Sequence, residues 1–114
     1  MIKVHEFLES NQRNAWLHCD DKDVYVRRGI HRHPDLGRIL NCFDIANITV
    51  HEPGKGTFSR WFDDLKPIMR AAGFDAIYIE SACPRFADHL YRKGLYEVRT
   101  DIYDVSFFYC WVDE

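Results

Sequence analysis

The feature that most constrains the fold of this chain is a strand pattern that runs through a short glycine loop into a helix pattern. Residues 39–51 are rich in apolar and β-branched side chains and predict a long strand. Residues 52–56 hold a proline and two glycines and predict a loop. From Phe58 onward, apolar residues recur at spacings of three and four, which predicts an amphipathic helix with Thr57 as its N-cap and Gly73 at its end. A strand joined to a helix in this way indicates an α/β fold.

The predicted strand contains a change in the phase of its apolar residues. Phe43 and Ile45 alternate with polar neighbours, and the alternation then moves by one residue to Ala46, Ile48 and Val50. Because side chains alternate between the two faces of a strand, such a change has two explanations. Either the strand is buried on both faces, or it carries a β-bulge near Ala46.

The other patterns predict, in order, a helix over 6–18, a short strand at 24–26, a turn at 31–37 between two antiparallel strands, a strand over 74–80, a helix from Pro84 to Gly94, and a C-terminal hairpin of 96–98 with 103–111 that turns near 100–101. The expected fold class is therefore α/β, with a mixed, mostly antiparallel sheet and flanking helices. We expect residues 1–114 to form a single domain.

Composition narrows the classes of function. With 46% hydrophobic residues the chain can bury a core without disulfides, and its four cysteines form no CxxC pair, which favours a reducing, cytoplasmic setting. A net charge of −3 without a basic cluster argues against nucleic acid as a partner. No secretory signal pattern and no apolar run of about 20 residues is found, so a membrane is not an expected partner either.

The glycine loop at residues 52–56 suits an anion. A glycine loop that feeds a helix N-terminus presents free backbone N–H groups, and Gly54 and Gly56 let a ligand approach the main chain closely. The loop lacks the Lys-Ser/Thr pair of a nucleoside-triphosphate P-loop, because Thr57 and Phe58 follow Gly56. It also lacks the third glycine of a dinucleotide-binding motif. Taken alone, the loop is either a plain connection or a phosphate cradle.

The run Asp44–Phe58 resembles the acetyl-CoA segment of the GNAT superfamily of acyl-CoA-dependent N-acetyltransferases. That family has a bulged strand, then Gln/Arg-x-x-Gly-x-Gly/Ala, then a helix. The block Ile77–Leu95 resembles the strand and helix that follow in the family, particularly in short members encoded by bacteriophages. Together with the C-terminal hairpin, the resemblance covers about residues 39 to 112.

The resemblance implies a GNAT-like, N-terminally reduced fold in which the bulge splays the central strand from its neighbour. Acetyl-CoA would be the co-substrate and no metal would be needed. The pantetheine arm would lie beside Ile48 and Val50, between the two strands. The pyrophosphate would lie on the loop and the helix start, at His51, Gly54, Lys55, Gly56, Thr57, Phe58 and Ser59.

Three departures from the family pattern affect this interpretation. His51 stands where the family usually has Gln or Arg, which changes a side-chain contact and leaves the backbone cradle intact. Cys83 stands near a position where related sequences often have Asn. The N-terminal part is shorter than in full enzymes, where two helices shape the acceptor site.

Acetyl transfer to an amine needs a base for the ammonium proton and an acid for the departing thiolate. The resemblance makes Tyr91 the acid, although it can equally be an amphipathic tyrosine that packs on the core. Glu80 is either the base or a residue that places a water, or else a carboxylate at a solvated strand end or one that caps the following helix. Asp44 is a second acidic candidate, or a polar residue on an exposed face. The pair His31 and His33 has no accompanying ligand set and is interpreted as surface, not as a metal site.

Two functions remain open from the sequence. The first is an N-acetyltransferase that moves an acetyl group from acetyl-CoA to an amine of a small molecule or of a protein, including a host protein. The second is a non-catalytic GNAT-like interaction protein, such as a phage effector that binds and inhibits a host protein in the host cytoplasm. The apolar stripe from Phe107 to Trp111 is either core or a homodimer surface.

Overall fold

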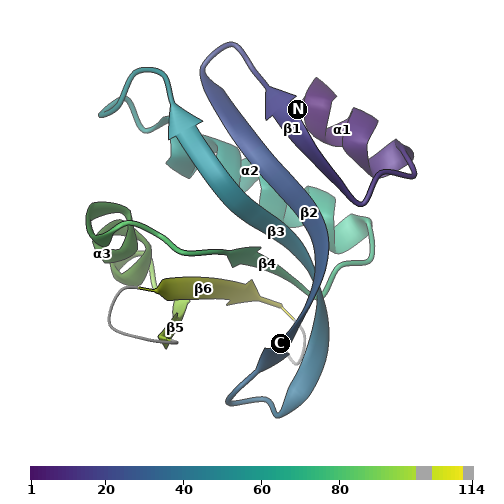
Figure 1. The fold of residues 1–114 in the computed structure, drawn as a ribbon, viewed down its shortest axis with the longest axis vertical. Coiled ribbons are helices and arrows are strands. Elements are labelled where there is room, and N and C mark those ends of the chain that lie inside the picture. Colours follow the sequence, from purple (N-terminus) through teal and green to yellow (C-terminus); the bar gives the residue numbers. More distant parts are fainter. Residues whose placement is uncertain (100–103, 112–114) are drawn as a thin grey trace.

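The computed structural model describes residues 1–99 and 104–111 of the chain. Within them, three helices and six strands form an α/β fold with one mixed sheet (Figure 1). The elements are α1 (Ile2–Glu9), β1 (Asn14–His18), β2 (Lys22–His33), β3 (Arg38–Val50), α2 (Thr57–Ala71), β4 (Ala76–Ile79), α3 (Pro84–Arg92), β5 (Tyr96–Arg99) and β6 (Val105–Cys110). None of the helices in this part of the chain is long and apolar enough to cross a membrane.

The sheet has the strand order β1-β2-β3-β4-β6-β5. Neighbouring strands are antiparallel except β3 and β4, which run parallel and are connected through α2. A parallel pair needs such a crossover because the chain must return to the same end of the sheet. The predicted mixed, mostly antiparallel sheet is therefore confirmed, as is the antiparallel pairing of β2 with β3 around the turn.

The phase change in β3 comes from a β-bulge at Ala46. Tyr25 of β2 pairs with Asn47, whereas the next residue, Val26, pairs with Ile45, so Ala46 has no partner in β2. Burial on both faces also holds over part of the strand, because residues 42–45 are all buried. The bulge allows Ile45 and Ile48 to face the same side of the sheet although they are three residues apart.

Strands β3 and β4 pair over only four residues. Cys42–Ile45 lies beside Ala76–Ile79, and the last backbone hydrogen bond runs from Glu80 N–H to Ile45 O at 3.0 Å. Beyond this point β3 continues along β2 to Val50, whereas the chain after Glu80 turns toward β6 and α3. The two strands therefore diverge after the bulge (Figure 1).

All three helices contribute to one core on one face of the sheet. Buried residues of α1, α2 and α3 pack with those of the strands in a single cluster that includes Phe7, Phe43, Phe62, Leu65, Ile77, Leu90 and Phe107. Burial of an aromatic or aliphatic side chain of this kind contributes about 1.5–3 kcal/mol. In the stripe from Phe107 to Trp111, the two phenylalanines and Trp111 are buried, which makes those positions core.

The opposite face of the sheet carries no helix from the described residues and is called the open face below. It holds a smaller buried cluster that includes Tyr78 and Phe108. The end of β2 curls over this cluster, since the ring of His33 lies 4.4 Å from that of Tyr96 although β2 and β5 are far apart in the strand order. Side chains of β2 therefore cover part of the open face.

Two local predictions are wrong. The helix expected over 6–18 is replaced by α1 and the edge strand β1, because Trp16 and Leu17 point to opposite faces of the sheet and β1 pairs with β2. The N-cap of α2 is Gly56, and Thr57 is the first helical residue. The helix predicted from Pro84 does begin there, as α3, and the C-terminal strands pair as expected. The predicted turn near 100–101 lies outside the described residues.

The guanidinium of Arg28 ties the end of α1 to the sheet. Its Nη2 donates to the carbonyls of Phe7, Leu8 and Ser10 at 3.1–3.3 Å, and its Nε donates to Gln12 O at 3.2 Å. The group also lies 4.8 Å from the ring of Phe7. Carbonyls at a helix C-terminus lack partners within the helix, so a cation there satisfies them and complements the helix dipole.

We predict that Arg28→Ala releases α1 from the sheet. Hydrogen bonds to a charged group contribute about 1.5–3 kcal/mol, so the free energy of unfolding should fall by about 2 kcal/mol. Urea unfolding measures this change, and limited proteolysis should cut the N-terminal segment first. Arg32→Ala, an exposed arginine of the same strand, is the control and should unfold like the wild type. Equal stability of the two variants would contradict this role.

Candidate functional site

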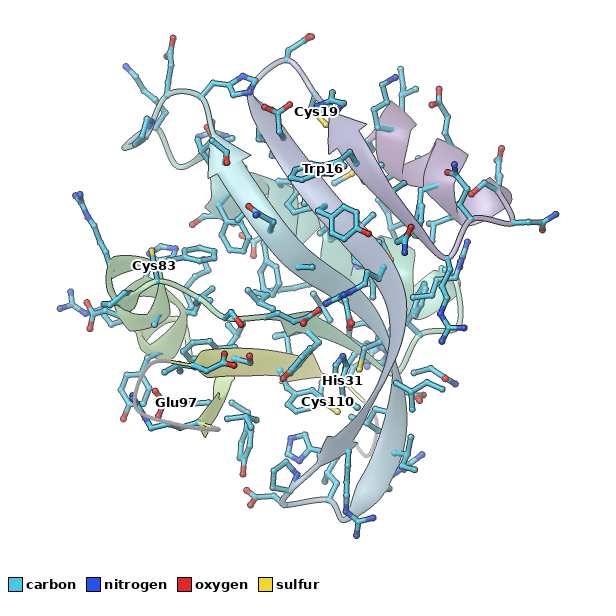
Figure 2. All side chains as sticks on the ribbon, in the orientation of Figure 1. Trp16, Cys19, His31, Cys83, Glu97 and Cys110 are labelled. Atoms are coloured by element: carbon cyan, nitrogen blue, oxygen red, sulfur yellow. The ribbon has the colours of Figure 1, made fainter. Side chains whose placement is uncertain are left out.

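A cavity of about 620 Å³ lies on the helix face, where β3 diverges from β4. It is bounded by the end of β3, the glycine loop, the first turn of α2 and the first turns of α3. Its walls are formed by Ile48, Val50, Pro53, Gly54, Gly56, Thr57, Phe58, Ser59, Cys83, Arg85, Phe86, Asp88, His89 and Arg92. Figure 2 shows Cys83 where the chain enters α3, facing the end of β3.

The glycine loop gives α2 an open N-terminus. Gly54 and Gly56 have φ of 84° and 71°, a left-handed conformation that glycine adopts without strain. No side chain caps the helix, and its first turn contains no acidic residue. The first N–H to bond within the helix is that of Arg60, so the N–H groups of the preceding turn lack helical partners. This end of α2 can therefore donate to an anion in the cavity.

The N-terminus of α3 opens into the same cavity. Cys83 is its N-cap and Pro84 occupies the first turn, again with no side-chain cap and no acidic residue in that turn. The positive ends of two helix dipoles thus meet at one cavity, and each favours a negative charge by a few tenths of a kcal/mol or more. This arrangement favours a ligand that carries more than one negative charge.

The side chains of the cavity add to this preference. Arg85, His89 and Arg92 lie on α3, and the carboxylate of Asp88 is 3.1 Å from Arg92. The hydroxyl of Ser59 on α2 lies 3.2 Å from Nε2 of His89, which joins the two helix starts. Arginine is suited to phosphate because its N–H groups match two oxygens at once.

Most of the predicted cofactor-binding residues line the cavity together. Ile48 and Val50 form its apolar wall, and Gly54, Gly56, Thr57, Phe58 and Ser59 form its loop and helix wall. His51 and Lys55 are not among the lining residues. The ring of His51 instead contacts the Asp23 carboxylate at 2.9 Å and Asp20 O at 3.0 Å, and the bond to Asp23 raises the pKa of His51. His51 therefore anchors the loop to the β1–β2 turn.

The predicted catalytic residues lie outside the cavity. Glu80 follows β4 at the point where β3 and β4 separate, and its carboxylate forms an ion pair with Arg27. Tyr91 is on the outer side of α3 with 65% of its surface exposed. The structure therefore brings Tyr91 neither to the cavity nor into the core.

Sequence reasoning missed the contribution of α3. Arg85, His89 and Arg92 are spaced by four and three residues, which is the spacing of one helix face. That pattern was available in the sequence, but its relation to the glycine loop depends on how two distant segments pack. Residues of α3 and residues of α2 together form the wall of the cavity.

Asp44 and the two histidines of β2 also differ from the expectation. Asp44 was interpreted as exposed or catalytic, yet only 3% of its surface is exposed, and burial raises the pKa of its carboxyl. His31 contacts that carboxyl, and His33 is buried, with Nδ1 accepting from the N–H groups of Asp35 and Leu36. The interpretation of these histidines as surface is therefore wrong. Among the described residues, no group of three or more His, Cys, Asp or Glu side chains could hold a metal ion.

Comparison with known proteins gave no relative: no protein-family model matches the chain, and neither a curated protein nor a solved structure matches it.

We predict that inorganic pyrophosphate binds in the cavity and stabilises the protein. Ser59→Glu should abolish the rise in melting temperature with pyrophosphate, because its carboxylate would repel the ligand. The unliganded variant should be as stable as the wild type or about 0.3–1 kcal/mol more stable, since an acidic residue in the first turn of a helix is favourable. Thermal melting with and without pyrophosphate measures both effects.

The control is Gln12→Glu, which makes the same change of charge at an exposed position outside the cavity. It should keep the full response to pyrophosphate. An unchanged response in Ser59→Glu would contradict an anion site at the two helix N-termini.

Proposed function

We propose that the protein is an acyl-CoA-dependent N-acetyltransferase of the GNAT type, and that the cavity binds acetyl-CoA. The observation that carries the proposal is the convergence of two uncapped helix N-termini on a cavity next to a bulged strand that leaves its parallel neighbour. The two helix N-termini suit a pyrophosphate. The divergence of β3 from β4 leaves a strand edge that can bind an extended chain. Acetyl-CoA contains both groups.

The pyrophosphate would lie over the first turn of α2. No side chain caps α2 at Gly56, so the main chain there is accessible to the pyrophosphate. The N–H groups of the first turn of α2 would donate hydrogen bonds to it. Arg85 and Arg92 of α3 would neutralise the phosphates from the opposite wall. The charge of the lining fits an anion better than it would fit a neutral ligand of the same size.

The pantetheine arm would run along β3 beyond the bulge. After Ile45 this strand has no β4 residue beside it, so main-chain groups on that edge remain for a ligand. Pantetheine contains two amides, which can form the hydrogen bonds that a neighbouring strand would otherwise make. Ile48 and Val50 provide apolar contact for its methylene groups.

The reaction would be direct attack of an amine on the thioester. The amine nitrogen forms a bond to the acetyl carbon, and the carbon–sulfur bond breaks with its electron pair leaving on the sulfur of CoA. No covalent intermediate with the protein is required. Because the hydroxyl of Tyr91 lies on the exposed side of α3, we expect the proton that the amine nitrogen loses to reach the thiolate through water.

We predict that acetyl-CoA binds more tightly than adenosine 3′-phosphate 5′-diphosphate, which keeps the pyrophosphate but lacks pantetheine. Each buried methylene contributes about 0.8 kcal/mol, so the difference in Kd should be roughly 10-fold or more. Isothermal titration measures both affinities. Ile48→Asp should weaken acetyl-CoA and leave the nucleotide fragment nearly unchanged.

Thr49→Asp is the matched control, because the adjacent side chain is exposed and lies outside the cavity lining. Equal affinity for the two ligands would contradict a pantetheine channel along β3. No binding of acetyl-CoA at millimolar concentration would overturn the proposed function. Acetyl-CoA binding without transfer to any amine would favour the non-catalytic interaction protein.

A further inference from the structure

The open face of the sheet carries a buried carboxyl–imidazole pair that the cavity does not use. We propose that His31 is the base that takes the proton from the amine acceptor, and that Asp44 is the positioning residue that orients it. This inference rests on the proposed function and adds the side from which the acceptor enters. Figure 2 shows His31 on the face of the sheet that has no helix.

Asp44 binds the ring of His31 through both carboxyl oxygens. Nε2 of His31 lies 2.8 Å from Oδ2 and 3.0 Å from Oδ1, and the carboxyl is almost completely buried. An ionised carboxylate only accepts, so Nε2 carries the hydrogen and donates it to Asp44. In neutral His31 the lone pair is then on Nδ1.

The pair is held from three sides. Gly29 lies beneath Asp44, and a Cβ at position 29 would lie 2.6 Å from Asp44 Cγ, so this glycine is required by space. The ring of His31 lies 3.7 Å from that of Tyr78, and Phe108 contacts it edge-on at 6.3 Å. A ring fixed in this way needs little reordering before it accepts a proton.

Nδ1 of His31 is available to accept a proton from a substrate. Among the described residues none forms a hydrogen bond with it, and 26% of the side chain is exposed. A substrate on the open face can therefore approach this nitrogen. The arrangement has the parts of a general base, namely a proton acceptor at the surface and a buried carboxylate that fixes its tautomer.

The pair lies beside the point where the two strands separate. Asp44 immediately precedes Ile45, which accepts the last hydrogen bond between β3 and the chain after β4. Arg27, the cross-strand partner of Asp44, reaches over β3 to the Glu80 carboxylate on the same face. The cavity opens on the helix face of this gap and the charged groups lie on the open face, so the thioester and the amine would meet from opposite sides.

The chemistry of these groups suits a primary amine that arrives as an ammonium ion. Asp44 and Glu80 attract the cation, and Arg27 holds Glu80 in position. The ammonium gives one proton to Nδ1 of His31, and the free amine then forms the carbon–nitrogen bond. The carbon–sulfur bond breaks and the sulfur keeps the electron pair. The nitrogen then loses its second proton, which passes through water to the resulting thiolate. The imidazolium returns its proton to solvent after the product leaves.

The test compares His31→Gln with the wild type in transfer from acetyl-CoA to four probe amines: ethanolamine, putrescine, tyramine and Nα-acetyl-lysine. Release of the CoA thiol measures the rate, and isothermal titration measures acetyl-CoA binding separately. We expect kcat/KM to fall roughly 100-fold or more, with the Kd of acetyl-CoA unchanged. His18→Gln removes another histidine paired with an aspartate, Asp23, at an exposed position, and should leave both quantities unchanged.

The pH profile separates a base from a merely structural histidine. The titratable groups near His31 are Asp44 and Cys42 on β3, Tyr78 on β4, Arg27 and His33 on β2, and Glu80 after β4. Burial raises the pKa of Cys42 and of Tyr78, so neither loses a proton in the acid range. Wild-type kcat/KM should fall as the imidazole becomes protonated, and His31→Gln should lack that decline. Imidazole in solution should partly restore the activity of His31→Ala, and Asp44→Asn should lower kcat/KM and shift the acid decline.

Three results would overturn the inference. One is transfer by His31→Gln at the wild-type rate with the wild-type pH profile. Another is a loss of activity in His31→Gln that keeps the acid decline and, in His31→Ala, is not restored by imidazole. The third is a wild-type protein that binds acetyl-CoA and acetylates none of the four amines. Failure to bind acetyl-CoA would be a different result, because it removes the proposed function itself.

Discussion

The shape of the sheet beside the cavity depends on Ala46, a residue of β3 that has no pairing partner in β2. Without the bulge, the pairing of β2 with β3 would turn either Ile45 or Ile48 away from the helices. With it, both side chains face the helices while the strand bends away from β4. The cavity, the free strand edge and the approach to the gap all follow from this local change in register. An extra residue of this kind costs only a lost ladder hydrogen bond, which neighbouring pairing along β2 offsets.

The two faces of the sheet differ because the helices cover only one of them. On the covered face, large apolar side chains such as Phe62 fill the space between helix and strand. On the open face, polar groups can remain close to solvent while they are held by rigid neighbours. Asp44 illustrates the balance, since its burial opposes ionisation whereas its bond to His31 favours it. Such opposed effects are typical of functional carboxyls, and here the absence of a side chain at Gly29 makes room for the group.

Patterns within short stretches of sequence predicted the strand, loop and helix at the centre of the fold. The features that the sequence did not predict depend on contacts between residues far apart in the chain. Periodicity within short windows predicted the strand that became β3 and the helix α2, and composition predicted the glycine loop. The bulge was one of two explanations for the phase change in the strand. The segment around Trp16 was assigned to a helix because its apolar residues also fit a helical face, and only pairing with β2 identifies it as a strand. The direction of the His51 ring depends on Asp23 in β2, and the His31–Asp44 pair joins two strands. The spacing of residues within a short stretch of sequence does not predict contacts of this kind between separate strands and loops.

The parallel pairing of β3 with β4 has a consequence for the order of folding. The β2–β3 hairpin joins residues close in sequence, whereas the β3–β4 contact closes a longer loop through α2, so we expect it to form later. The cavity lies at this contact, so we expect chains in which only the hairpin has formed to lack the cavity. A ligand in the cavity would then slow unfolding more than it speeds folding, since it recognises a junction formed near the end of the process.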